Sequence, residues 1–231
     1  MANQSNFFFD FPTLPKELIR AFKKSTDAAY KTFSREYGDY IETFFNPLLK
    51  FLVFWEKLLV ATPWLVIIGV VCVFAYYGTR SYKIVIGIII SFFFVGYMGM
   101  WEDMMESMGF IIVATIMAIA IGIPTGVWMS KSNRAQAVIT PILDFMQTLP
   151  PFVYLIPVVM LLGIGKIPGL ISVIVYAIPP MIRLTNLGIR EVDREILEAA
   201  DSFGATPWQK LTQVQFPLAL PTIFAGVNQT I

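Results

Sequence analysis

The sequence predicts an all-α membrane protein with about five to six transmembrane helices and an N-terminal interfacial helical region. Of its 231 residues, 56% are hydrophobic and only 14% are charged. Soluble domains typically hold about 45–50% apolar and about 25% charged residues. The excess of apolar residues falls into several long runs, which is the pattern that membrane-spanning helices require.

The composition also excludes several kinds of function. A net charge of +1 gives no bulk attraction for nucleic acid. The single cysteine, Cys72, lies inside an apolar run and has no partner for an intramolecular disulfide, so we expect it to pack. Histidine, the commonest metal ligand and general base, is absent. We therefore expect no catalytic residue, no metal, no cofactor in this chain and no nucleic-acid partner.

Residues 1–62 are expected to form an amphipathic, interfacial helical tail. Basic and acidic residues alternate through residues 1–45, and aromatic residues are scattered among them. Segment 47–60 is apolar but is interrupted by Lys50, Glu56 and Lys57, so it is too short and too charged to span a bilayer. We expect this tail to lie on the membrane or on the exit face of the protein itself.

Six candidate spans follow the tail. They cover approximately residues 63–78, 84–100, 108–129, 135–164, 168–182 and 218–231. We assign the first two to a peripheral region, 63–107, and the others to a core domain, 108–231. The last span is still apolar at Ile231, and it is too short to cross a bilayer, so we expect the chain to be truncated there.

Prolines and glycines predict where these spans are interrupted. Glycines and a proline in 122–126 are expected to loosen the end of the third span. Prolines at 141 and at 150–151 interrupt the fourth span, and those at 179–180 are expected to end the fifth.

Loop charges predict the orientation, because short cytoplasmic loops are enriched in Lys and Arg. The loops after the first, third and fifth spans carry Arg80, Lys83, Lys131, Arg134, Arg183, Arg190 and Arg194. The opposite loops hold Glu102, Asp103 and Glu106, or Lys166 alone. We therefore expect the three basic loops inside the cell and the N-terminus outside.

A few polar and aromatic residues in the fourth segment are candidates for a translocation pathway. Asp144 and Gln147 lie one helical turn apart. They indicate a polar contact at the pore entrance, a polar pair at the cytoplasmic membrane surface or a helix–helix hydrogen bond. The aromatic pair after the prolines offers a surface to a passing cation, or simply packs between helices. The candidates are Asp144, Gln147, Pro150, Pro151, Phe152 and Tyr154.

Segment 183–217 is too polar to lie in lipid and carries ordered helix signals. Residues 191–200 combine strong helix formers with an apolar face. Gly204 permits a left-handed break, Thr206 is a good N-cap for a second short helix, and Pro207 suits its first turn. The pattern predicts a helix–turn–helix knob that projects from the membrane, and it argues against the alternative of a merely solvated loop.

The same segment carries a family resemblance. The pattern Glu198-Ala199-Ala200-x3-Gly204-x9-Val214-x-Phe216-Pro217 resembles the EAA loop of ABC importer permeases, with Val and Phe where Ile and Leu are usual. Segments 141–157, 179–190 and 218–231 are similar to the glycine betaine/proline betaine/choline class of these permeases. The resemblance is close over about 108–231 and loose over the N-terminal tail.

The resemblance implies a type I ABC importer permease in the bacterial cytoplasmic (inner) membrane, among lipids. Two permease copies, usually identical, would form the pathway, and an external binding protein would deliver glycine betaine, proline betaine, choline or carnitine. No P-loop sequence is present, so ATP and Mg are expected on a separate pair of ATPase subunits. The residues expected to couple to that ATPase pair are Glu198, Ala199, Ala200, Asp201, Phe203, Gly204, Pro207 and Pro217.

Three alternatives stay open at this point. The chain is an ABC permease for a different small solute, an ion-coupled secondary transporter or a channel, or a membrane scaffold. An ion-coupled transporter needs membrane-embedded charges or paired discontinuous helices with internal symmetry, and neither is apparent in the sequence.

Overall fold

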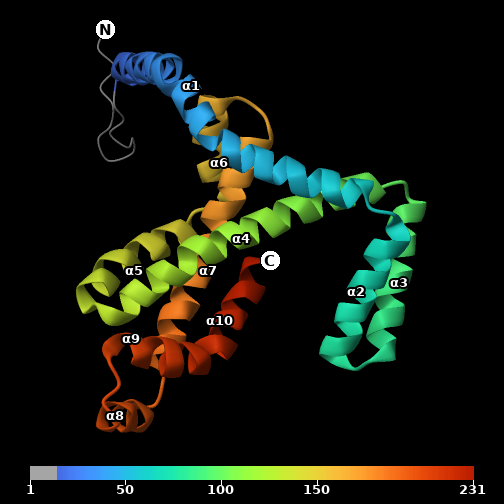
Figure 1. Cartoon of the computed structure of the whole chain (residues 1–231). Helices are drawn as coiled ribbons and strands as arrows, with labels where there is room; N and C mark the ends of the chain where they lie inside the picture. Colours follow the sequence, from blue (N-terminus) through green and yellow to red (C-terminus); the bar gives the residue numbers. More distant parts are fainter. Residues whose placement is uncertain (1–14) are drawn as a thin grey trace, which may run out of the picture. The chain divides into compact units, whose positions relative to one another are not determined.

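The computed structural model describes residues 15–231, without the side chains of residues 34, 35, 39 and 42; residues 1–14 of the expected tail lie outside it. Throughout 15–231 the chain is helical and contains no strand (Figure 1). It divides into two compact units, residues 1–45 and 46–231. The helices are α1 (Lys16–Ala61), α2 (Trp64–Thr79), α3 (Tyr82–Tyr97), α4 (Trp101–Lys131), α5 (Asn133–Thr148), α6 (Pro151–Leu162), α7 (Lys166–Arg190), α8 (Arg194–Ser202), α9 (Pro207–Gln209), the π-helix η1 (Lys210–Gln215) and α10 (Phe216–Thr230).

Two of these helices, α4 and α7, are long and apolar enough to cross a membrane by themselves. Two pairs of consecutive helices pass the same test together but are sharply bent, α1 with α2 by 102° and α5 with α6 by 89°. Helix α3 is apolar and shorter. The chain is therefore an all-α, multi-pass membrane protein, as the composition predicts.

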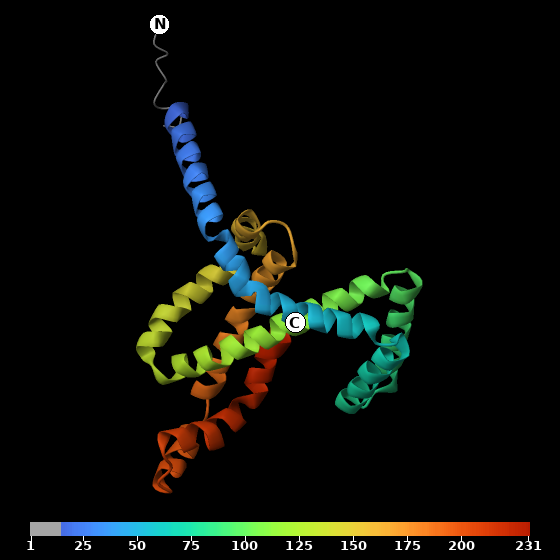
Figure 2. The same cartoon turned by 45° about the horizontal axis from the view of Figure 1, so that its top comes forward.

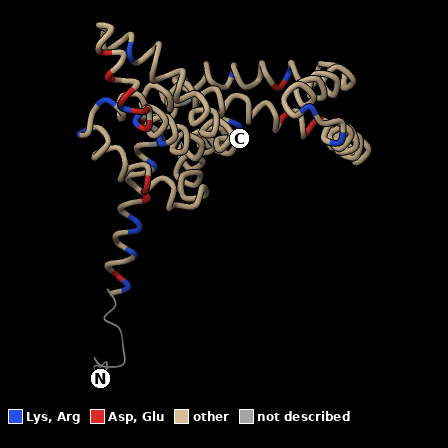
Figure 3. Tube along the Cα trace, turned by 90° about the horizontal axis from the view of Figure 1, so that it is seen from below, with Lys and Arg blue, Asp and Glu red and all other residues tan. Residues whose placement is uncertain are grey.

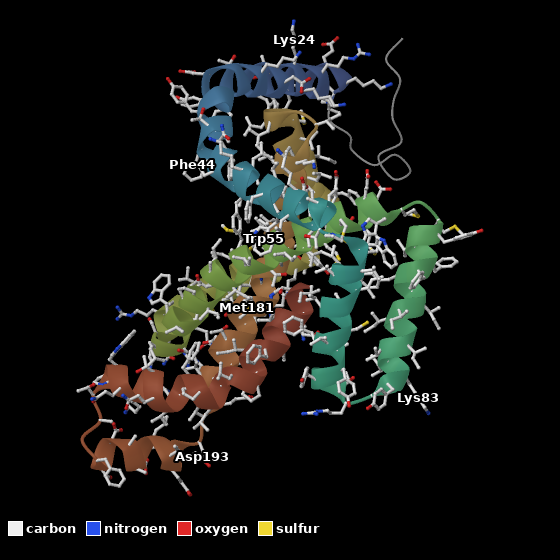
Figure 4. All side chains as sticks on the ribbon, turned by 45° about the vertical axis from the view of Figure 1, so that its right-hand side comes forward. Lys24, Phe44, Trp55, Lys83, Met181 and Asp193 are labelled. Atoms are coloured by element: carbon white, nitrogen blue, oxygen red, sulfur yellow. The ribbon has the colours of Figure 1, made fainter. Side chains whose placement is uncertain are left out.

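Small residues hold α4 and α7 together at the centre of the second unit. A Cβ atom added at Gly122 would lie 2.5 Å from Met181 Cγ, and one at Gly126 would lie 2.5 Å from Thr185 Cβ. In both pairs the α7 residue lies 59 positions later in the chain, so the two helices run in the same direction (Figures 1 and 2). Met181, labelled in Figure 4, is completely buried at this contact.

These contacts correct two expectations about the spans. Helix α4 does not loosen around Pro124 but continues to Lys131, and its neighbouring glycines serve close packing instead. Helix α7 does not end at Pro179 and Pro180 but continues to Arg190. Prolines are tolerated inside transmembrane helices when neighbouring elements support the interrupted turn. Here α4 packs along α7 both before and after its proline pair, and α10 packs against the residues that follow the pair.

Helix α10 packs along α7 in the opposite direction. A Cβ atom at Gly188 would lie 2.9 Å from Thr222 Cβ, and one at Gly226 would lie 3.2 Å from Leu184 Cβ. Later residues of α10 therefore meet earlier residues of α7. One core cluster joins α7 to η1 and α10 and consists of Met181, Ile189, Leu211, Ala219 and Ile223.

The last part of α1 packs against the α4–α7 pair. Leu52 is completely buried in a cluster with residues of α4 and α7. One turn later Glu56 is only 5% exposed, and Lys166 Nζ donates to Glu56 Oε2 over 2.6 Å. Lys166 also lies 3.5 Å from Glu106 Oε2, so one ammonium group at the start of α7 joins α1 to α4. Segment 47–60 is thus helical, as expected, and its position at the membrane surface stays a prediction.

Candidate functional site

The candidate site is the knob formed by α8, the following turn and α9, which lies at one end of the second unit (Figure 1). Asp193, labelled in Figure 4, caps α8 because its carboxylate accepts a hydrogen bond from the Glu195 amide over 3.0 Å. Within the helix, Arg194 and Glu198 form an ion pair one turn apart, with 2.8 Å between Nε and Oε1. Local chemistry therefore accounts for the start of this helix.

Helix α8 ends as the sequence predicts. Gly204 has a φ of +76°, which is the left-handed conformation that glycine adopts without steric cost. Its amide donates to the Asp201 carbonyl over 2.9 Å, and the Ala205 amide donates to the Ala200 carbonyl over 3.1 Å. This pair of hydrogen bonds is a Schellman motif, so the left-handed glycine fixes the direction in which the chain leaves α8.

The second helix of the knob also begins as predicted. Thr206 Oγ1 accepts from the Gln209 amide over 3.3 Å, while the Thr206 amide donates to Gln209 Oε1 over 2.9 Å. This is a capping box, with Pro207 in the first turn. The helix then continues through η1 into α10, so the knob is built on the start of a long helical segment that packs along α7.

The knob carries large apolar side chains that the described residues leave uncovered, next to exposed charged side chains of α8. No residue of α8 is buried, and Ile196 is 42% exposed. Phe203 and Trp208, on either side of the turn, are 91% and 70% exposed. Lys210 Nζ and Asp201 Oδ1 lie 2.5 Å apart and tie α8 to η1. The knob therefore presents large apolar side chains on an internally braced frame, a combination typical of surfaces that bind another protein.

Polar contacts connect the base of the knob to the ends of the long helices. Lys131, the last residue of α4, donates to Gln215 Oε1 in η1 over 2.5 Å. Arg190, the last residue of α7, donates to the Met129 carbonyl over 2.8 Å and to Asn133 Oδ1 over 3.0 Å. We call these two sets of contacts the clamp. The clamp joins η1, α4, α5 and α7 where the knob is attached.

The clamp was not predicted from the sequence, in which Lys131 and Arg190 serve only as orientation signals. One signal was available, because parallel spans place the ends of α4 and α7 on the same side of the membrane. A second was the polar Gln215 between the apolar Val214 and Phe216. Its partner, however, lies 84 positions earlier in the chain, and no local pattern identifies it.

The pathway candidates lie elsewhere, around the bend between α5 and α6. Asp144 of α5 forms an ion pair with Arg183 of α7. A polar contact between helices was one of the roles considered for Asp144 and Gln147. For Asp144 such a contact is present, and its partner is Arg183. The Tyr154 hydroxyl donates to the Met146 carbonyl across the bend. Gln147, Pro150, Pro151 and Phe152 are exposed. The structure brings none of these residues to the knob, and their role in a pathway stays a prediction.

The described residues show no group of three or more His, Cys, Asp or Glu side chains that is arranged to hold a metal ion. Cys72 is a free thiol, partly buried in α2.

A bundle of apolar helices, two of them long enough to cross a membrane, and a braced, exposed helical knob define the chain as an integral membrane protein. Residues 118–231 match the family described as binding-protein-dependent transport system inner membrane component. This matched half of the chain contains both the knob and the bent α5–α6 segment. The chain belongs to this family of transport permease subunits, which are not enzymes.

Three curated relatives share extensive identity with the chain. The glycine betaine/carnitine transport permease protein GbuB of Listeria monocytogenes is 44% identical over 176 residues, which cover 73% of this chain and 61% of GbuB. The glycine betaine/proline betaine transport system permease protein ProW of Escherichia coli is 50% identical over 143 residues, 62% of this chain and 40% of ProW. The glycine betaine transport system permease protein OpuAB of Bacillus subtilis is 42% identical over 143 residues, 62% of this chain and 51% of OpuAB.

The matched regions therefore span between 40% and 61% of the lengths of these relatives. The family and the class of fold follow directly from the matches.

Proposed function

We propose that this chain is the membrane permease subunit of an ATP-driven importer for quaternary-ammonium osmolytes. Glycine betaine, proline betaine and carnitine are the solutes named for the relatives GbuB, ProW and OpuAB. The observation that carries the proposal is the position of the knob. It lies within the matched region, its frame is held by caps and an ion pair, and its apolar side chains are exposed.

In this proposal the knob binds a separate ATPase subunit. The contact residues are Glu198, Ala199, Ala200, Asp201, Phe203, Gly204, Pro207 and Pro217. The small alanine pair permits close approach of the partner's backbone, and Phe203 and Trp208 provide the apolar area that the contact buries. ATP and Mg are held by the ATPase, and this chain makes and breaks no covalent bond.

A second copy of the chain completes the pathway, and an external binding protein delivers the solute. Binding of ATP brings the two ATPase subunits together, and the braced knobs follow as rigid bodies. The clamp passes that displacement to α4, α5 and α7, and the pathway opens outward; hydrolysis reverses the change and releases the solute inward. In this arrangement the knob lies in the cytoplasm and the N-terminus lies outside.

The bent α5–α6 segment contributes the pathway surface in this proposal. Phe152 is 70% exposed and lies directly after the proline pair, where an aromatic face attracts a quaternary ammonium group. Asp144 and Gln147 lie on the α5 side of the same bend. The tight, high-affinity recognition of the solute belongs to the external binding protein.

Gly204 provides the sharpest test. Its added Cβ atom would meet nothing within 4 Å in this chain, so within the chain substitution acts through the left-handed backbone. A non-glycine residue in that conformation costs about 1–2 kcal/mol, which corresponds to about a five- to thirty-fold change in an equilibrium constant. We expect Gly204→Ala to reduce glycine betaine uptake and co-purification of the ATPase by such a factor, and Gly204→Asn to retain more of both, because Asn tolerates this conformation.

Gly99 offers a matched control. It has the same φ of +76° and equally open surroundings, but it lies between α3 and α4, far in sequence from the knob. Gly99→Ala should leave uptake and ATPase binding unchanged. If both alanine variants behave alike, or if Gly204→Ala transports normally, the knob is not the coupling element.

A further inference from the structure

The first unit of the chain carries a continuous apolar face that the proposed function does not use. In α1, exposed apolar side chains recur at intervals of three, four and eleven residues, so they lie on one side of the helix. Phe22, Tyr40 and Phe44 are the most exposed, at 74%, 75% and 77%. The face consists of Leu18, Phe22, Phe33, Tyr37, Tyr40 and Phe44.

The opposite side of the same helix is basic. Four cationic side chains, together with Asp27 and Ala28, line one surface hollow. Successive residues of an α-helix are rotated by about 100°, and this rotation places the four cationic side chains on the side of α1 opposite the apolar face. These side chains are Arg20, Lys23, Lys24 and Lys31. Figure 3 shows the charges along this segment, and Figure 4 labels Lys24 and Phe44 on it.

Charge is also unevenly distributed along the helix. Residues 16–31 hold five basic and two acidic residues, whereas residues 32–45 hold one basic and three acidic residues. None of the side chains described within 16–45 is buried. Within residues 15–45, the described part of the first unit, nothing covers the apolar face. Single exposed apolar residues are common, but a continuous face of six is not.

We propose that residues 16–45 lie flat on an anionic lipid surface. Aromatic side chains on one face and Lys and Arg on the other are the pattern of helices that lie in the membrane interface, with the apolar face at the acyl boundary and the cations reaching lipid phosphates. The chain is a multi-pass membrane protein, so such a surface is always within reach. Charge complementarity favours anionic lipid for residues 16–31, and aromatic burial alone holds residues 32–45.

The test uses the full chain in nanodiscs made either of phosphatidylcholine alone or of phosphatidylcholine with one-third phosphatidylglycerol. Cys72→Ser removes the natural thiol, and a nitroxide label is placed at Phe22→Cys, Tyr40→Cys or Ala28→Cys. Accessibility to oxygen and to a water-soluble nickel complex reports the immersion of each label. Ala28 lines the basic hollow and is the control for the opposite face.

We expect labels at positions 22 and 40 to be immersed in lipid and the label at 28 to stay in water. Immersion at 22 should require phosphatidylglycerol and immersion at 40 should not. Lys23→Gln with Lys24→Gln should shift the docked fraction at position 22 about thirty-fold toward water. Lys50→Gln with Lys57→Gln removes the same charge outside the segment and should change nothing.

Three results overturn the proposal. Labels at 22 and 28 that are equally accessible to the nickel complex show that the apolar face is not in lipid. A label at 22 that is equally immersed in both nanodiscs shows that anionic lipid plays no part, and a label shielded from both the nickel complex and oxygen shows that protein covers the face. Immersion of these labels does not depend on the ATPase or on the solute. A negative result would therefore leave the proposed transport function unaffected.

Discussion

Gly126 is the residue at which α4 and α7 leave least room for change. An added Cβ atom would lie 2.5 Å from Thr185 Cβ and 2.8 Å from the Ile182 carbonyl oxygen, a backbone atom. At Gly122 the close atoms are Cγ and Cβ of Met181, and the nearest backbone atom is 3.5 Å away. We expect Gly126→Ala to destabilise the fold by about 1–3 kcal/mol and Gly122→Ala by less.

Unfolding of the purified chain in mixed micelles, followed by circular dichroism, measures this difference. Gly87→Ala is the control, since an added Cβ atom there meets nothing within 4 Å. That variant should be neutral or slightly more stable, because alanine favours a helix interior over glycine. An equal effect of all three substitutions would mean that α4 and α7 do not meet at these glycines.

The carboxylate of Glu56 depends on Lys166. Glu56 is 5% exposed, and its second oxygen, Oε1, has no hydrogen-bond partner among the described residues. Lys166→Met should therefore leave a buried charge unpaired and destabilise the fold by about 1–3 kcal/mol. Adding Glu56→Gln to Lys166→Met should recover part of the loss, because the charge is then removed.

Glu106→Gln is the matched control for this pair. Its carboxylate lies farther from Lys166, at 3.5 Å, and its side chain is 52% exposed, so removing the charge should change stability by less than about 1 kcal/mol. The same unfolding measurement serves all three variants. If Lys166→Met unfolds like the unchanged protein, the ion pair contributes nothing to holding α1 against α7.

At the scale of elements, the clamp is the connection between the knob and the membrane helices. If it transmits displacement, Lys131→Met and Gln215→Leu remove the same contact, and their effects should not add. We expect each single variant to lower the number of solute molecules imported per ATP hydrolysed by about two- to ten-fold, which corresponds to the 0.5–1.5 kcal/mol of one hydrogen bond. The double variant should be no worse than either single variant.

Uptake and ATP hydrolysis are measured together in proteoliposomes that contain the complete transporter. Lys83→Met, in the exposed start of α3, is the charge-matched control and should leave the ratio unchanged. Unchanged co-purification of the ATPase separates loss of transmission from loss of docking. Strictly additive effects of the two substitutions would show that the 2.5 Å contact carries no coupling.

Elements differ in how far the sequence determines them. The turn at Gly204 and the cap at Thr206 are predicted correctly, because each depends on the chemistry of a few adjacent residues. The course of α7 through Pro179 and Pro180 is predicted wrongly, because packing by α4 and α10 outweighs the local preference of proline. The pairing of Glu56 with Lys166 joins residues 110 positions apart, and only the fold brings them together.

At the scale of the whole molecule, the ion pairs are consistent with the orientation deduced from loop charges. Glu106 and Lys166 meet at the starts of α4 and α7, and Lys131 and Arg190 lie at their ends. Both helices therefore cross in the same direction, as alternating loops require. We predict that the starts face outward and the ends face the cytoplasm.

Labelling with a membrane-impermeant maleimide tests this orientation in intact cells, on a Cys72→Ser background. Glu102→Cys, near the start of α4, should be labelled directly. Ser202→Cys, at the end of α8 in the knob, should be labelled only after the cells are permeabilised. The reverse result would place the knob outside the cell and remove the basis for an ATPase partner there.

The glycine contacts between α4 and α7 also limit how this protein is able to move. Met181 and Thr185 of α7 fill the space beside Gly122 and Gly126 of α4, so axial sliding would drive these side chains out of the space that the glycines leave. The motion that keeps these contacts is a rotation of α4 and α7 together as one rigid body. The sharp corners on either side of it, 102° between α1 and α2 and 89° between α5 and α6, are then the places where the polypeptide has to flex.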